Sequence, residues 1–191
     1  MGVYEVAISR RSVRRFKDAA VPYAVLEKCV NAARLAPTGR NNQLCEHIII
    51  DDERLLPRVS DNIRTWAEQP EQRPQAYIIT MINSSLETEN DTSRSVAAYD
   101  VGMAMENMIL VAQEQGIGTC PVLSFKEGSL KQILTIPDSY RIALVLALGY
   151  ADENPILDLA AGSTERWIDD QGTRHVPKRK LKDVAHHNSF P

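Results

Sequence analysis

The chain has 191 residues, 43 % of them hydrophobic and 25 % charged, which is enough to bury a core without disulfides or structural metals. Its net charge of −3 argues against a protein that binds nucleic acid over its whole surface, and no apolar run approaches the ~20 residues that span a bilayer. Cys29, Cys45 and Cys120 form no C-x-x-C pair, and the first residues lack the apolar core of a secretory signal. We therefore expect a cytoplasmic protein with reduced thiols and no membrane partner.

Hydrophobic periodicity predicts helices and strands that alternate along the chain. A short helix is expected over residues 4–9, and a longer one over 22–36, begun by Pro22 and ended before Pro37. Further helices are expected over 52–68, interrupted or started at Pro57, over 93–116, with Gly116 as its stop, and over 126–134. Strands are expected over 46–51, apolar enough for burial on both faces, and over 75–83, 117–123 and 141–151.

This alternation, without repeats or a low-complexity linker, predicts a single α+β or α/β domain over residues 1–191. From about residue 155 the chain becomes polar and irregular. The tail, residues 155–191, has too few apolar residues to form a core alone, so we expect it to wrap around another body such as a second subunit.

The segment "SRRSVRRF", residues 9–16, gathers basic side chains around Ser12, namely Arg10, Arg11, Arg14 and Arg15. A solvated helix end is the common meaning of such a run. A phosphate site is the more specific alternative, because arginine offers paired donors and serine adds a hydroxyl. The alternation also predicts that Val13 and Phe16 are apolar anchors and that Arg15 faces solvent.

Two polar turns supply further hydrogen-bonding groups. In "APTGRNNQ", residues 36–43, the amides of Asn41 and Gln43 suit a ring with alternating donor and acceptor edges, although such loops commonly bond their own backbone. In "EQGIGTCPV", residues 114–122, Gly116 and Gly118 either let a backbone N–H approach a ligand or form a helix cap and turn. The stretch is not a dinucleotide fingerprint, because Pro121 stands where a third glycine is needed.

The remaining clusters predict no metal site and no nucleic-acid partner. A basic run, Lys178, Arg179 and Lys180, has a solvated surface patch as its common meaning. The four histidines lack the spacing of a metal site, and no nucleophile-elbow or phosphate-loop motif is present. The basic runs also lack the interleaved aromatic residues typical of nucleic-acid binding.

Taken together and in order, these motifs resemble the nitroreductase family of FMN-dependent NAD(P)H oxidoreductases, from about residue 4 to the C-terminus. The matching stretches are "SRRSVRRF", "APTGRNNQ", "DVGMAMENMILVAQEQGIGTCPV", "IPDSYRIALVLALGYAD" and "PKRKLKDVAHHN". The resemblance implies an α+β fold with a central, mainly antiparallel sheet flanked by helices. It also implies an intertwined homodimer with FMN at the subunit interface.

The resemblance further implies which residues hold the phosphate and the pyrimidine side of the flavin, namely Arg10, Arg11, Ser12 and Arg14. Because reduced flavin is anionic near N1 and O2, Arg14 would stabilise it electrostatically. The tail would complete the phosphate site with Lys178 and Arg179, and Lys180 is the alternative if the register differs by one.

The flavin ring has its own implied partners. Asn41 and Gln43 would contact the ring or the ribityl chain from the partner subunit, and the turn at Gly116, Gly118 and Thr119 would lie against the isoalloxazine. The implied reaction is a ping-pong hydride transfer, from NADH or NADPH to flavin N5 and then to an organic acceptor such as a nitroaromatic or a quinone. No side-chain nucleophile is required.

Two departures from the family pattern bear on the acceptor. Leu44-Cys45 replace a common Pro-Trp, and Leu123 stands where many nitro- and quinone-reducing relatives carry a glutamate. The N5 side of the flavin is therefore expected to be more apolar, and the short stretch "NSSLETENDTS" predicts an open pocket. A reductase for a non-nitro acceptor, such as an enone or a halogenated aromatic, and a flavin-binding module or sensor with little turnover are the alternatives.

Overall fold

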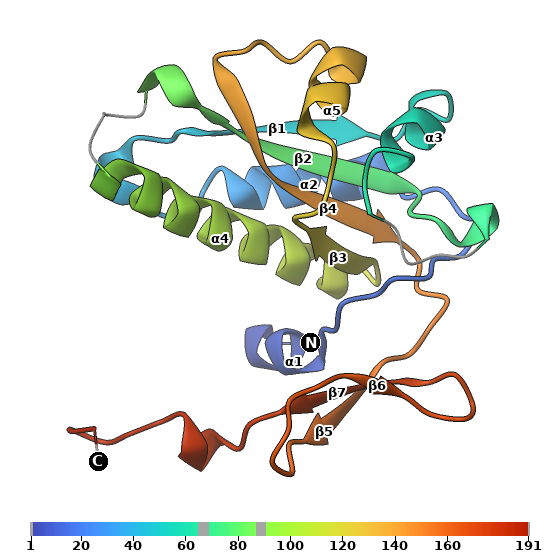
Figure 1. Ribbon diagram of the computed structural model, residues 1–191, viewed down its shortest axis with the longest axis vertical. Helices are drawn as coiled ribbons and strands as arrows, with labels where there is room; N and C mark the ends of the chain where they lie inside the picture. Colours follow the sequence, from blue (N-terminus) through green and yellow to red (C-terminus); the bar gives the residue numbers. More distant parts are fainter. Residues whose placement is uncertain (1, 65–68, 87–90, 191) are drawn as a thin grey trace. The chain divides into compact units, whose positions relative to one another are not determined.

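Figure 1 shows the computed structural model, which describes residues 2–64, 69–86 and 91–190. The chain divides into two compact units, Met1–Asp152 and Glu153–Pro191. The boundary lies close to residue 155, where composition predicted the start of the tail. That the whole chain forms one domain, with its tail around a partner subunit, remains a prediction. None of the helices in the described ranges is long and apolar enough to cross a membrane.

The first unit is built on a four-stranded sheet with the strand order β1-β2-β4-β3, in which every pairing is antiparallel. The strands are β1 (Cys45–Ile50), β2 (Ala76–Asn83), β3 (Gly118–Val122) and β4 (Tyr140–Gly149). The central strands β2 and β4 consist mostly of buried aliphatic residues, because helices cover both faces of the sheet. The expected antiparallel sheet in an α+β fold is confirmed.

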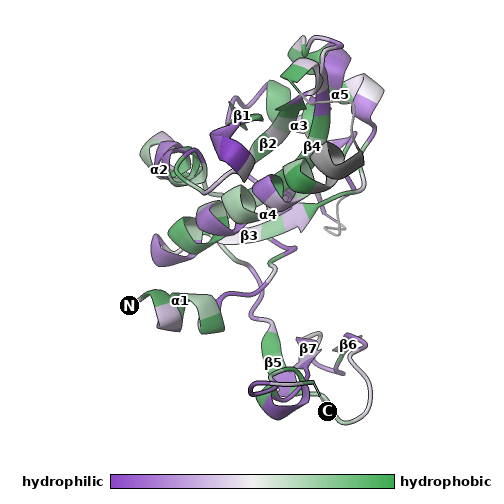
Figure 2. Ribbon diagram, turned by 90° about the vertical axis from the view of Figure 1, so that its left-hand side faces the viewer, coloured by the Kyte–Doolittle hydropathy of each residue, from purple (hydrophilic) through white to green (hydrophobic). Residues whose placement is uncertain are grey.

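Helices lie on both sides of the sheet (Figure 1). The α-helices are α1 (Val3–Ser9), α2 (Tyr23–Ala33), α3 (Leu55–Ser60), α4 (Asp91–Glu114) and α5 (Glu127–Leu134), with short 3₁₀ turns at Gly39–Asn41, Pro70–Gln72, Ser84–Leu86 and Leu181–Asp183. On one face, Leu26 of α2 and Met108 of α4 belong to one buried cluster with the sheet. On the other face, Val59 of α3 and Leu130 of α5 are buried against Tyr77 of β2. Figure 2 shows hydrophilic and hydrophobic residues mixed along α4.

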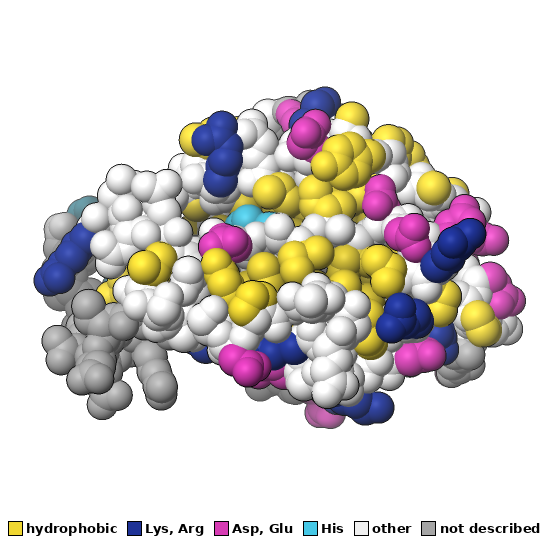
Figure 3. All heavy atoms as spheres, turned by 90° about the horizontal axis from the view of Figure 1, so that it is seen from above, with side chains coloured by type: hydrophobic (Ala, Val, Ile, Leu, Met, Phe, Trp, Pro, Cys, Tyr) yellow, Lys and Arg dark blue, Asp and Glu magenta, His cyan; other side chains and the backbone are white. Residues whose placement is uncertain are grey.

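Two expected elements differ from the structure. The strand over 46–51 lies at the sheet edge as β1, where most side chains are half-buried, so the expected burial on both faces is wrong except at Ile50. Figure 3 accordingly shows apolar side chains at the surface on the side of this unit that carries α5 and β1. The helix expected over 52–68 is only α3, which contains Pro57 in its first turn, where a missing N–H costs no helical bond. Residues 65–68 lie outside the described ranges.

The second unit contains a three-stranded sheet that the sequence did not predict. Its strands are β5 (Ile156–Leu159), β6 (Trp167–Ile168) and β7 (Arg174–Lys178), in the order β5-β7-β6. His175 in the central strand is held from two sides, with Nδ1 2.8 Å from Oδ2 of Asp158 and Nε2 3.3 Å from Oδ2 of Asp169. Its ring stacks on Trp167 with a centroid separation of 3.8 Å. A polar cluster thus takes the place of an apolar core in this small sheet.

Candidate functional site

The arginine-rich segment after α1 runs along β3. Ser12 and Thr119 form a parallel bridge, and the backbone N–H of Val13 donates to the carbonyl of Thr119 at 2.9 Å. The side chains of Val13 and Phe16 are buried in the core, as the sequence predicted. Two motifs from distant parts of the sequence, 9–16 and 114–122, are therefore neighbours in the structure.

Two glycines permit this close approach. Gly118 of β3 and Gly149 of β4 are paired in register. A Cβ atom on Gly118 would lie 2.8 Å from Cγ2 of Val13, and one on Gly149 would lie 2.7 Å from Cδ1 of Phe16. Gly116 is required for a different reason. It has a positive φ of 76° in the turn that ends α4, a conformation that glycine adopts more readily than other residues.

The arginines of the segment differ in their surroundings. The side chain of Arg14 is 8 % exposed, and its Nη1 donates to the carbonyl of Ser12 at 3.3 Å. Nη1 of Arg11 donates to the carbonyl of Ile8 at 2.9 Å, and burial together with the charge of Arg10 lowers the pKa of Arg11. Arg15 is half-buried and its Nε atom is enclosed, so the prediction that it faces solvent is wrong; its backbone carbonyl accepts the N–H of Asp152 at 2.9 Å.

The cluster has the character of an anion site. Nε of Arg10 is enclosed and, among the described residues, has no hydrogen-bond partner. Buried donors are nearly always paired, so an enclosed guanidinium nitrogen with no protein acceptor fits a site completed by a bound ligand. Burial, and to a smaller extent the charge of Arg10, lowers the pKa of Arg11, and a bound anion would offset both effects.

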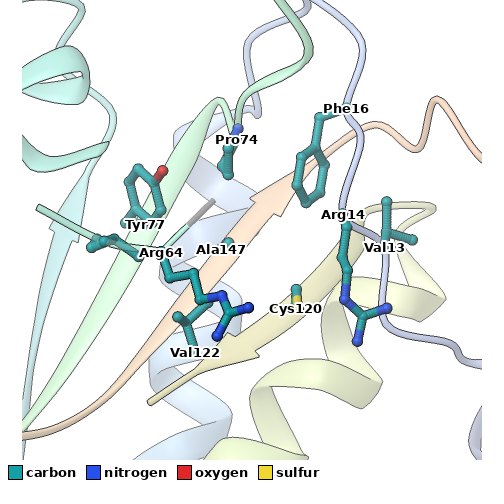
Figure 4. Close-up of a pocket in the computed structure, with 10 residues that line it drawn as sticks. Val13, Arg14, Phe16, Arg64, Pro74, Tyr77, Cys120, Val122 and Ala147 are labelled. Carbon is teal, nitrogen blue, oxygen red and sulfur yellow. The ribbon is translucent and has the colours of Figure 1, made fainter. Parts of the chain in front are cut away.

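A small apolar cavity lies behind the segment, with a volume of about 10 Å³, about the room of one water molecule. Arg14 and Arg64 line it, and Figure 4 shows their guanidinium groups on either side of Cys120. The sequence analysis did not single out Arg64, which lay inside a predicted helix. The structure brings it here because Ile63 pairs with Phe125 and the N–H of Arg64 donates to Ser124 at 2.9 Å.

The loop with Asn41 and Gln43 lies elsewhere in the unit, and both side chains are exposed. It packs against the first half of α4, where the N–H of Gly39 donates to Oδ1 of Asp100 at 3.0 Å. The Ser12–Thr119 bridge instead lies beyond the far end of α4, after Glu114. At 1.5 Å per residue, Asp100 and Glu114 are about 20 Å apart along the helix. A single chain therefore does not bring the two predicted groups of flavin contacts together.

The residues that depart from the family pattern have different surroundings. Leu44 is a core residue, packed with Ile82. Burial and the nearby Asp100 raise the pKa of the Cys45 thiol to about 11, so it is protonated at neutral pH. Leu123, directly after β3, is 75 % exposed.

The basic run of the tail belongs to the second unit. Lys178 is the last residue of β7, paired with Leu159 of β5, and Arg179 donates a side-chain hydrogen bond to the carbonyl of Asp183. Lys178, Arg179 and Lys180 are all exposed. Their contact with a flavin phosphate remains a prediction.

Comparison with known proteins identifies the fold. The model of the nitroreductase family matches residues 7–78 and 71–150. The chain belongs to the nitroreductase family. An NADPH-dependent oxidoreductase of Staphylococcus haemolyticus is 25 % identical over 205 residues, covering 98 % of this chain and 74 % of that protein. An iodotyrosine deiodinase of Thermotoga neapolitana is 23 % identical over 174 residues, covering 79 % of this chain and 89 % of that protein.

A solved structure shows the same nitroreductase fold. The FMN-dependent nitroreductase from Clostridium difficile R20291 superposes with a TM-score of 0.67 and 21 % identity, over 97 % of this chain and 98 % of that one. The match extends through the second unit, which the family model leaves uncovered.

Proposed function

We propose that the protein is an FMN-dependent NAD(P)H oxidoreductase that reduces a small organic acceptor. The observation that carries the proposal is the pairing of the arginine segment with β3 at Ser12 and Thr119, because it places arginine and serine, residue types that bind phosphate, beside the turn and strand for which the family resemblance implies contact with the flavin ring. Membership of the nitroreductase family and the names of the relatives support the cofactor and the electron donor.

The residues present fit a flavin mononucleotide. Arg10, Arg11 and Ser12 offer guanidinium and hydroxyl donors to a phosphate, and the enclosed Nε of Arg10 provides one donor with no protein acceptor in the described ranges. Arg14 adds a fixed, largely buried positive charge beside the glycine strand, where it would stabilise an anionic ring. When bound, FMN supplies the redox chemistry, and the chain supplies placement and electrostatic field.

We further propose that the active form is a homodimer in which the two subunits share each site. The Asn41–Gln43 loop is bonded to α4 at Asp100, whereas the arginine segment pairs with β3 at Thr119, beyond Glu114 at the end of α4, and Asp100 and Glu114 are about 20 Å apart along the helix axis. If both groups contact one FMN, the loop must come from a second copy of the chain. Lys178 and Arg179, on the second unit, would complete the phosphate contacts.

A halogenated aromatic is a second candidate acceptor. Leu123 is an exposed apolar side chain directly after β3, where the family pattern has a glutamate in many nitro- and quinone-reducing members. An apolar residue there favours an uncharged aromatic ring over a ligand that needs a hydrogen-bonding carboxylate. The deiodinase of Thermotoga neapolitana is a relative whose name states such chemistry.

Replacement of Arg14 tests the cofactor site. Arg14→Ala removes one or more charge-assisted hydrogen bonds, each worth ~1.5–3 kcal/mol, so FMN affinity should fall roughly 10- to 150-fold in a fluorescence-quenching titration. Arg14→Lys should recover part of the loss. Arg34→Ala is the matched control, because Arg34 is an exposed cation at the end of α2 whose Nε bonds only Asn31 among the interactions described for it. Equal affinity of Arg14→Ala and wild type would refute the site.

The enzymatic part of the proposal has its own test. Anaerobic mixing of the FMN-loaded protein with NADH or NADPH should bleach the flavin absorbance within seconds to minutes. Flavin that stays oxidised with both donors would support a binding module instead. An acceptor screen against the reduced protein, including nitroaromatic, quinone and iodinated phenol compounds, then separates the two acceptor classes.

A further inference from the structure

A buried carboxylate on α4 supports the loop that carries Asn41 and Gln43. Asp100 is 1 % exposed, and its Oδ1 accepts the backbone N–H of Gly39 at 3.0 Å. Its Oδ2 is also enclosed and has no hydrogen-bond partner in the described parts of the chain. Burial of a carboxylate with a single donor is costly, so this placement requires a compensating role.

The loop above Asp100 has an unfavourable backbone. Arg40, Asn41 and Gln43 have positive φ values of 54°, 57° and 50°, in the left-handed region that residues other than glycine rarely adopt. Hydrogen bonds within the loop support part of this conformation, including those from the N–H of Asn42 to the carbonyl of Gly39 at 3.1 Å and from Nε2 of Gln43 to the carbonyl of Asn41 at 3.4 Å. Thr38 accepts the N–H of Asn41 at its carbonyl, at 3.0 Å, and the N–H of Gln43 at its hydroxyl, at 3.3 Å.

The beginning of the loop is fixed against the helix. A Cβ atom on Gly39 would lie 2.4 Å from Cγ1 of Val96, so the backbone lies directly on α4. At that point the Asp100 carboxylate accepts the backbone N–H of Gly39. Such strained segments persist only where the surrounding structure holds them, and they are typical of ligand-binding sites.

We infer that Asp100 is a positioning residue, which holds the Thr38–Gln43 loop in the strained conformation that presents Asn41 and Gln43 to the ligand of the partner subunit. The inference rests on the proposed function, since the ligand is taken to be FMN. Asp100 itself touches the loop backbone and not the cofactor. Its effect therefore passes through Gly39 to the two amide side chains.

Replacements of Asp100 provide the test. In Asp100→Ala, loss of the acceptor should lower FMN affinity about tenfold and shift the absorption bands of bound flavin towards those of free FMN. The amide hydrogens of residues 38–43 should exchange about tenfold faster in the protein without added FMN. Asp100→Asn keeps an oxygen acceptor for Gly39 and should restore affinity, spectrum and exchange.

A second variant separates positioning from general stability. Ile109→Val removes one buried methylene from the same helix without touching the loop, so it should destabilise the fold mildly and leave the flavin spectrum and the exchange of residues 38–43 unchanged. The inference is overturned if Asp100→Ala matches wild type in both affinity and exchange, or if Ile109→Val reproduces its effects. If wild-type protein binds no FMN, the proposed function fails, whereas the exchange of the Gly39 amide still decides whether Asp100 holds the loop.

Discussion

The packing of the arginine segment on Gly118 predicts a large effect from one added methyl group. In Gly118→Ala the new Cβ would lie 2.8 Å from Cγ2, 3.0 Å from Cβ and 3.2 Å from Cγ1 of Val13. A rotation about χ1 of Val13 moves its methyl groups but not its Cβ, so the segment itself must shift. That shift strains the core by ~1–3 kcal/mol and weakens the 2.9 Å bond from Val13 to Thr119, worth ~0.5–1.5 kcal/mol.

We therefore expect Gly118→Ala to lower the free energy of unfolding by about 2 kcal/mol, which corresponds to a melting temperature about 4–8 °C lower in a protein of this size. Thermal unfolding followed by circular dichroism, without added FMN, measures this change in melting temperature. Gly128→Ala is the control, because its Cβ meets nothing within 4 Å inside α5, and alanine there should raise stability by ~0.5–1 kcal/mol. A Gly118→Ala protein as stable as wild type would refute the described packing of the segment.

Two further predictions concern other parts of the chain. Thr135 ends α5 with φ 56° and ψ 40°, a left-handed conformation that is costly for a β-branched residue, so Thr135→Asn should raise the melting temperature by about 2 °C; a lower value would contradict the strained cap. In the second unit, burial alone would lower the pKa of His175, but its bonds to Asp158 and Asp169 raise it above the ordinary 6.5. The protonated ring therefore stabilises the small sheet fully below pH 6.5, and this contribution is lost as pH rises through the raised pKa. The protection factors of the β7 amides, which correct the exchange rates for the pH dependence of intrinsic exchange, should fall over that range in wild type but not in His175→Gln, and identical pH profiles of these factors would refute the assignment.

Local signals in the sequence predicted most elements of the first unit. The apolar spacing of α4, with Gly116 behind it, placed the helix within two residues at each end, because a long period repeated over many turns has few alternatives. The N-terminal part of the candidate site was also predictable, since Val13 and Phe16 alternate with the cations of the same segment. These features depend on neighbours in sequence.

Features that depend on distant contacts were missed. The sheet of β5, β6 and β7 has little hydrophobic alternation in its sequence, because its central residue is His175, which stacks on Trp167 and bonds to Asp158. Such a polar cluster produces no periodic pattern from which a strand could be predicted. Arg64 reaches the cavity only through the pairing of Ile63 with Phe125. Asp100 lay within a predicted helix, and its isolated charge among small and apolar residues was the one available signal of a buried partner.

The bridge between Ser12 and Thr119 also determines when the first unit can be completed during synthesis. Residues 9–16 leave the ribosome long before β3 exists, so the arginine segment has no partner until most of this unit has been made. Contacts between positions so far apart in sequence carry a high loop-closure cost and form late in folding. A ligand held by these arginines consequently cannot guide the early steps, and it stabilises the finished unit by mass action.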